Sequence, residues 1–214
     1  FAIGSAALTA MALLAAYLEE VRGALILAGD KAGKAVFLHT NYNTKFSDNI
    51  PIASASINDF IQFFQIHILN PKFLLGVFIG SMVAFVFSSM TIKAVGRADG
   101  QMVKEVRRQF KEIPGIMEGT GKPEYAKCVK IATQGAQKEM LLPALVGLLT
   151  PILSGVILGV PSVLGVLLGA LSTGFVLAVM MNNAGGAWDN AKKYIETDKK
   201  AKGTDIHKAS IVGD

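Results

Sequence analysis

One stretch of the sequence combines residue types that hold divalent cations and phosphate groups. It runs from Asn183 to Glu196 and places the carboxylate of Asp189 three residues before the ammonium group of Lys192. On a helix this spacing puts both groups on one face, where the carboxylate could bind a divalent cation and the ammonium a phosphate oxygen. A structural ion pair at a helix end, with the lysine reaching toward water, has the same spacing. Spacing alone leaves both interpretations open.

The patterns of the commoner catalytic sites are missing from the sequence. It contains no Ser/His/Asp set, no cysteine nucleophile pattern and no zinc-binding pattern, and its single cysteine, Cys128, cannot form an internal disulfide. The glycine-containing stretch at 29–34 lacks the spacing of a phosphate-binding loop. His39 and His67 have no ligand spacing around them. The sequence therefore offers no recognisable pattern for a covalent nucleophile or a zinc site.

The composition excludes an ordinary soluble enzyme. Of the 214 residues, 51% are hydrophobic and 17% charged, and the mean hydropathy is +0.44, whereas soluble domains carry about a quarter charged residues. The 49 residues from Met140 to Trp188 contain no Asp, Glu, Lys, Arg or His. About 20 apolar residues suffice to cross a bilayer as a helix, so this run can hold two spans. The sequence predicts an integral membrane protein.

The apolar segments predict an all-α, polytopic bundle of transmembrane helices. Spans are predicted at about 1–18, 73–95, 140–160 and 162–188, with the start of a fifth at 207–214. The first span opens inside an apolar stretch without an initiating methionine, so we expect a fragment of a longer chain. In the 19–72 connection, the stretch Ile57–Leu69 is predicted to be an interfacial helix, and no strand is predicted.

Lysine and arginine residues predict how the spans are oriented. Ten lie in 91–138 and six in 188–214, none lies around Pro161, and the remaining five lie in 19–72 with five acidic residues. By the positive-inside rule, 96–138 and 189–207 are predicted to be cytoplasmic and 19–72 extracytoplasmic. In a membrane protein this distribution also explains the net charge of +5 without a nucleic-acid partner.

Two further patterns concern packing and the ends of the spans. Gly-x-x-x-Gly occurs at Gly76/Gly80, Gly155/Gly159 and Gly165/Gly169 and predicts close contacts between helices. The second span is predicted to continue as a helix over Ile92–Phe110. The basic residues at its far end, Arg107, Arg108 and Lys111, favour a solvated helix over an anion-attracting rim.

Several motifs in order resemble the membrane-integral, ion-pumping inorganic pyrophosphatases. Asn183–Glu196 is similar to a motif on that family's next-to-last helix, and His207–Asp214 to the opening of its last-helix motif. The segments Lys93–Ala98, Glu105–Phe110 and Ile113–Gly119 resemble the cytoplasmic helix and loop that precede them, and Phe1–Leu8 resembles the end of an earlier core helix. Nothing in 19–70 contributes to the resemblance.

The resemblance implies a dimeric, sixteen-span fold of which about the last third is present, and an active site facing the cytoplasm of a bacterial-type cell. It implies Mg²⁺-dependent hydrolysis of pyrophosphate coupled to pumping of H⁺ or Na⁺ across the inner membrane, with K⁺ as an activating ion in some members. By position, Asp189 matches a Mg²⁺-coordinating carboxylate, Lys192 a lysine that binds the substrate phosphate, and Asp214 the first acid of the last-helix cluster. The alternative is a secondary transporter or channel in which Asp189 and Lys192 form a non-catalytic charge relay.

Overall fold

Four long helices dominate the computed structural model, which describes residues 1–31, 37–43, 46–197 and 201–213. They are α1 (Ala2–Lys31), α3 (Pro71–Glu112), α4 (Tyr125–Leu158) and α5 (Val160–Thr197). Within the described residues, these are the helices long and apolar enough to cross a membrane. The predicted helical membrane bundle is confirmed, and the chain is an integral membrane protein.

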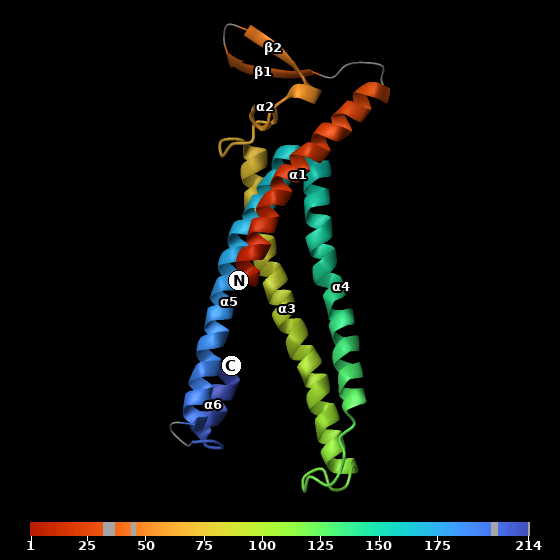
Figure 1. Ribbon diagram of the computed structural model, residues 1–214, viewed down its shortest axis with the longest axis vertical. Helices are drawn as coiled ribbons and strands as arrows, with labels where there is room; N and C mark the ends of the chain where they lie inside the picture. Colours follow the sequence, from red (N-terminus) through yellow and green to blue (C-terminus); the bar gives the residue numbers. More distant parts are fainter. Residues whose placement is uncertain (32–36, 44–45, 198–200, 214) are drawn as a thin grey trace.

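The long helices alternate in direction along the chain (Figure 1). Helix α3 runs from the end that carries the 46–70 region to the opposite end, α4 returns, and α5 runs back again. The α3–α4 connection and the short helix α6 (Asp205–Gly213) therefore lie toward the same end of the molecule. This arrangement brings the two lysine-rich segments of the sequence to one end, as the charge pattern predicted for two segments on one side of a membrane.

Local sequence explains where the long helices begin and end. Asn70 caps α3 by accepting a hydrogen bond from the Lys72 backbone N–H at 3.0 Å, and Pro71 occupies the first helical position, where its missing N–H costs nothing. Between α4 and α5 the chain turns at Gly159, whose φ of +88° disfavours residues with a Cβ. One glycine is thus enough to separate two helices that each run for more than thirty residues.

All four long helices extend beyond the predicted spans, and α4 begins at Tyr125 rather than near residue 140. Helix α3 continues to Glu112, which confirms its predicted polar extension, and α5 continues through Gly185 and Gly186 to Thr197. Helix α1 also continues, to Lys31, although the sequence analysis ended the span at residue 18. Its added turns carry Glu19, Glu20 and Arg22, which interrupt the apolar pattern without interrupting the helix.

The 19–72 connection contains structure that the sequence analysis did not predict. Strands β1 (Phe37–Asn43) and β2 (Phe46–Pro51) form an antiparallel pair, followed by a short 3₁₀ turn, η1 (Ile52–Ser54). Helix α2 covers Ile57–Phe63 and is shorter than predicted; Ser56 and Asp59 cap it reciprocally. A small apolar core joins this region to the long helices through Leu18, Ile52, Ala55, Phe60, Phe73 and Leu164.

Helices α3 and α5 approach each other backbone to backbone. A Cβ added at Gly76 would overlap the Ser162 carbonyl oxygen, and one at Gly80 would overlap that of Val166. The contact is reciprocal, because a Cβ at Gly165 or Gly169 would overlap carbonyl oxygens of α3. Two of the three predicted Gly-x-x-x-Gly motifs therefore face each other in one helix crossing, which confirms their packing role.

Candidate active site

The polar end of α5 carries the residues that the sequence analysis singled out. Because the helix is continuous to Thr197, Asp189, Lys192 and Glu196 lie on successive turns of one face. Gly185 and Gly186 precede them, and a Cβ added at either glycine would have no neighbour within 4 Å. Among the described residues, the helix backbone at these two glycines is therefore bare.

Asp189 forms ion pairs with two lysines. Its Oδ1 lies 3.3 Å from the Lys192 ammonium, and its Oδ2 accepts a hydrogen bond from the Lys193 ammonium at 2.5 Å. The sequence analysis paired Asp189 with Lys192 and did not assign Lys193, although the four-residue spacing was a usable signal. A single carboxylate thus holds two cationic groups at the end of the apolar helix.

The exposure of these side chains distinguishes their possible roles. The Lys192 side chain is 23% exposed and that of Asp189 39%, whereas Lys193 is 62% exposed. Hydrogen bonds from Lys193 and then Lys192 lower the pKa of Asp189, which lies beyond the apolar part of α5, so its carboxylate stays ionised. A half-exposed, ionised carboxylate beside a largely covered ammonium group is suited to binding a cation and an anion together.

A metal centre is not complete within the described residues. No group of three or more His, Cys, Asp or Glu side chains that could hold a metal is found among the described residues. Asp189 offers one carboxylate to a metal, and Asp214 lies outside the described residues. Because Mg²⁺ is usually held by one or two carboxylates together with water and substrate phosphate oxygens, the donor at Asp189 fits this ion as part of a larger site.

A second charged cluster lies where α3 meets α4, and the sequence analysis missed its connectivity. The Arg108 guanidinium is 2.7 Å from carboxylate oxygens of Glu105, Glu112 and Glu124. Lys127 adds a contact of 3.4 Å to Glu105. Arg108 is therefore neutralised by acids, which argues against a part for it in an anion-attracting rim. Only the fold shows the contact with Glu124, because this residue caps the start of the next helix, α4.

Buried hydrogen bonds complete that cluster. Glu105 is 6% exposed and accepts bonds from Arg108 and from the Gln109 amide, and these lower its pKa to about 2. The Gln109 side-chain oxygen in turn accepts the Glu124 backbone N–H at 3.0 Å. Nearer the membrane-spanning part, Arg97 donates two bonds to Glu139. These contacts fasten α3 to α4 and are structural in character.

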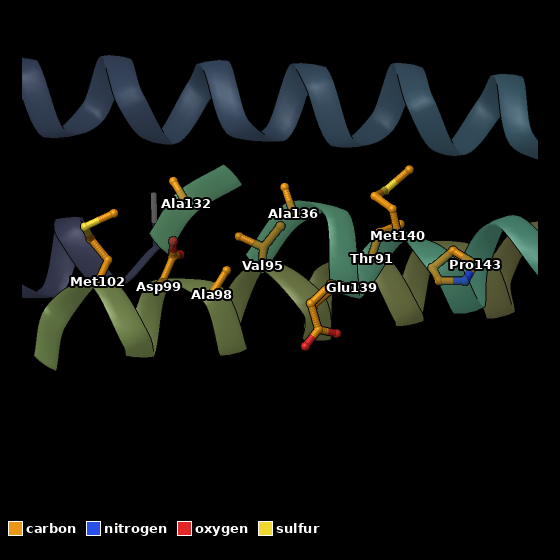
Figure 2. Close-up of a pocket in the computed structure, with 11 residues that line it drawn as sticks. Thr91, Val95, Ala98, Asp99, Met102, Ala132, Ala136, Glu139, Met140 and Pro143 are labelled. Carbon is orange, nitrogen blue, oxygen red and sulfur yellow. The ribbon is translucent and has the colours of Figure 1, made fainter. Parts of the chain in front are cut away.

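The cavity in Figure 2 is a poor site for a polyanion. It lies between α3 and α4, has a volume of about 300 Å³ and is lined mostly by apolar side chains such as Val95, Met102 and Met140. Its charged lining residues are the acids Asp99 and Glu139. Neither Asp189 nor Lys192 lines it, so the cavity and the α5 site are separate features.

Comparison with known proteins identifies the family. The family described as "Inorganic H+ pyrophosphatase" matches residues 1–214. The chain belongs to this family. The α5 site thus lies in a chain whose whole length fits one family pattern, as the motifs of the sequence predicted.

Individual relatives of the pyrophosphatase family support the assignment. The chain is 52% identical over its whole length to a putative K⁺-stimulated pyrophosphate-energized sodium pump of Bacteroides thetaiotaomicron, and covers 28% of that protein. It is 46% identical over its whole length to a K⁺-insensitive pyrophosphate-energized proton pump of Caldanaerobacter subterraneus, and covers 26% of it. The chain therefore spans about a quarter of these relatives, somewhat less than the third that the sequence analysis expected.

Proposed function

We propose that the protein containing this chain hydrolyses inorganic pyrophosphate with the help of Mg²⁺ and uses the reaction to move H⁺ or Na⁺ across a membrane. The observation that carries the proposal is the Asp189–Lys192 pair on a continuous helix, within a stretch that fits the pyrophosphatase family along its whole length. Pyrophosphate is a polyanion, and it needs cations placed where negative charge accumulates as the bond breaks.

Each residue of the α5 site has a proposed role. The Lys192 ammonium would hold a phosphate oxygen, and its low exposure would strengthen that contact by keeping water away. Asp189 and, in the last-helix motif, Asp214 would hold Mg²⁺, which when bound supplies positive charge to the phosphate and leaving oxygens. Hydrolysis by water needs no covalent nucleophile, so the missing serine and cysteine patterns do not weigh against this reaction.

The setting of the site is also part of the proposal. The lysine-rich end of the bundle would face the cytoplasm of a bacterial-type cell, with the protein in its inner membrane, because basic residues gather at that end. The family resemblance supports a homodimer. Relatives named as K⁺-stimulated and as K⁺-insensitive, and as sodium and proton pumps, match this chain at comparable identity. The pumped ion and activation by K⁺ therefore need direct assays.

The test replaces the two central residues in the full-length protein. Asp189→Asn keeps the shape but removes the charge that would hold Mg²⁺, and Lys192→Met keeps the stem but removes the phosphate contact. We expect each change to lower pyrophosphate turnover by roughly 10²–10³, the scale for losing one preorganised electrostatic contact. Near-normal hydrolysis by purified, folded Asp189→Asn and Lys192→Met proteins would remove both residues from the active site.

The choice of control follows from the geometry. Lys193→Met is not neutral, because Lys193 makes the shortest contact to Asp189; we expect a loss smaller than that of Lys192→Met. Lys104→Met, at an exposed position on the extension of α3, removes the same charge away from α5 and should leave turnover within about twofold of the parent.

The alternative of a transporter with an Asp189–Lys192 charge relay predicts a different result. Such a protein would move ions without consuming pyrophosphate. Its Asp189 and Lys192 variants would lose transport, and neither they nor the parent would hydrolyse pyrophosphate. The family match disfavours this alternative. Pyrophosphate-dependent Na⁺ or H⁺ uptake by proteoliposomes of the full-length protein, measured together with phosphate release, separates the two functions.

A further inference from the structure

A side-chain pair ties the end of α5 to the beginning of α6. The Nε2 of His207 lies 2.6 Å from Oε1 of Glu196. His207 is 8% exposed, and the Glu196 side chain is 29% exposed. In Figure 1, α6 lies beside the last turns of α5, as this contact requires. The pair therefore joins two helices that carry separate motifs of the sequence.

The hydrogen bonds of His207 define its tautomer. The Gly203 backbone N–H donates to Nδ1 at 3.1 Å, so Nδ1 must be the nitrogen without a hydrogen. In the neutral ring the hydrogen is then on Nε2, which donates it to the Glu196 carboxylate. Both ring nitrogens are engaged, and the ring cannot rotate without losing two bonds.

The backbone around His207 is shaped for this arrangement. Gly203 has a φ of +86°, a conformation that brings its N–H toward the His207 ring and that residues with a Cβ rarely adopt. Thr204 immediately precedes α6, and its hydroxyl donates to the Ala201 carbonyl at 2.6 Å. Ser210, also buried, donates to the His207 carbonyl oxygen at 2.7 Å. The first turn of α6 is thus ordered around this histidine.

The position of the pair relates it to the α5 site. Glu196 lies four residues after Lys192 and seven after Asp189, so it occupies the same helix face two turns further on. His207 lies seven residues before Asp214, and α6 continues to Gly213. The Glu196–His207 contact therefore sets the direction of α6 relative to α5. It thereby also sets how the last-helix motif approaches Asp189 and Lys192.

We propose that Glu196 and His207 are positioning residues that hold the start of α6 in register with the Asp189–Lys192 face of α5. They touch neither substrate nor metal in this role, which rests on the function proposed above. Loss of the pair lets α6 swing relative to α5, so acids and lysines on the two helices no longer meet one pyrophosphate. A displacement of about 1 Å can lower catalysis by up to about 10²-fold.

Two substitutions of His207 separate the hydrogen bond from the mere presence of a polar side chain. In His207→Gln the side-chain amide reaches as far as Nε2 and can still donate to Glu196, whereas in His207→Asn it is too short. In the full-length protein we expect His207→Asn and Glu196→Ala to lower kcat/KM for pyrophosphate by about 10- to 100-fold. His207→Gln should stay within about threefold of the parent, and His67→Asn, at an exposed histidine outside the site, serves as the control.

A distance measurement tests the positioning without relying on activity. Spin labels at Ala191→Cys and Ala209→Cys, exposed positions on α5 and α6, are placed in the full-length protein with all native cysteines replaced. We expect a narrow distance distribution by pulsed electron paramagnetic resonance in the parent and in His207→Gln, and a broad or shifted one in His207→Asn.

Each outcome decides the proposal. A broadened distribution together with the kinetic loss, both restored in His207→Gln, supports it. An unchanged distribution in His207→Asn overturns it, as does a broadened one with normal kcat/KM. If the parent does not hydrolyse pyrophosphate, the proposed function and this catalytic role fail together, while the spin labels still show whether the pair orders α6.

Discussion

Adding one methyl group at Gly169 should loosen the contact between α3 and α5. A Cβ at this position would overlap the Val77 carbonyl oxygen and would lie 3.0 Å from the Ser81 backbone nitrogen. Backbone atoms of a helix cannot rotate out of the way as a flexible side chain can, so the two helices must move apart. Gly174 lies on the same helix, and a Cβ there would meet nothing within 4 Å.

The magnitude follows from comparing the two positions. Forcing extra volume into a packed interface costs about 1–3 kcal/mol, whereas alanine is favoured over glycine in a helix by up to about 1 kcal/mol. Both Gly169→Ala and Gly174→Ala gain the helical preference for alanine. The difference between their stabilities therefore isolates the cost of overpacking. We therefore expect Gly169→Ala to be about 1–3 kcal/mol less stable than Gly174→Ala. Gly169→Leu should cost at least as much as Gly169→Ala, since the Cβ already meets the backbone.

Thermal unfolding of the purified full-length protein in detergent measures this difference. Gly80→Ala should behave like Gly169→Ala, because a Cβ at Gly80 meets the Val166 carbonyl oxygen in the same crossing. The double variant should lose less stability than the sum of the single variants, since helices already moved apart have room for the second methyl group. Equal unfolding temperatures for Gly169→Ala and Gly174→Ala would refute the close packing described for α3 and α5.

Two other measurements examine the orientation of the bundle and its charged cluster. In a cysteine-free full-length protein, single cysteines are introduced at the exposed positions Lys122, Lys202 and Asn58. Those at Lys122 and Lys202 should react with an impermeant thiol reagent from one side of the membrane, and the one at Asn58 from the other. Labelling of all three from one side would contradict the orientation. The pKa of Glu105, lowered to about 2 from its ordinary 4.5, makes its contribution to stability complete above about pH 4.5 and lost as the pH falls through about 2. The difference in stability between the parent and Glu105→Gln should therefore be constant from pH 7 to about pH 5 and should shrink below that. A difference that is the same at pH 3 and pH 7 would contradict the contact between Glu105 and Arg108.

The arrangement of α5 places a packing surface and the residues proposed for chemistry on one helix. Its first half carries Gly165 and Gly169, which bring it against the α3 backbone, and its last turns carry Asp189 and Lys192. A helix held firmly at one end presents side chains at the other with little freedom. The chain thus supplies a rigid support for one part of a site that the remainder of the protein would complete.

The sequence by itself determined the membrane class, the long helices and the candidate residues. Apolar runs of about 20 residues leave the backbone few options other than a helix in a bilayer, so the helices follow from composition and length. Two of the predictions rest on local patterns within one helix: the spacing of Asp189 and Lys192, and the Gly-x-x-x-Gly motifs. Such patterns can be recognised without knowing the fold.

Only the tertiary structure decided which residues from different elements meet. Glu124 neutralises Arg108 across the α3–α4 connection, and His207 binds Glu196 across the α5–α6 connection. The sequence contains these residues without indicating their partners, because the geometry of a turn sets the distance between the segments it joins. The β1–β2 pair and the extra turns of α1 also escaped prediction, since hydrogen bonding and apolar contacts with Leu18 and Phe60 outweigh weak local preferences there.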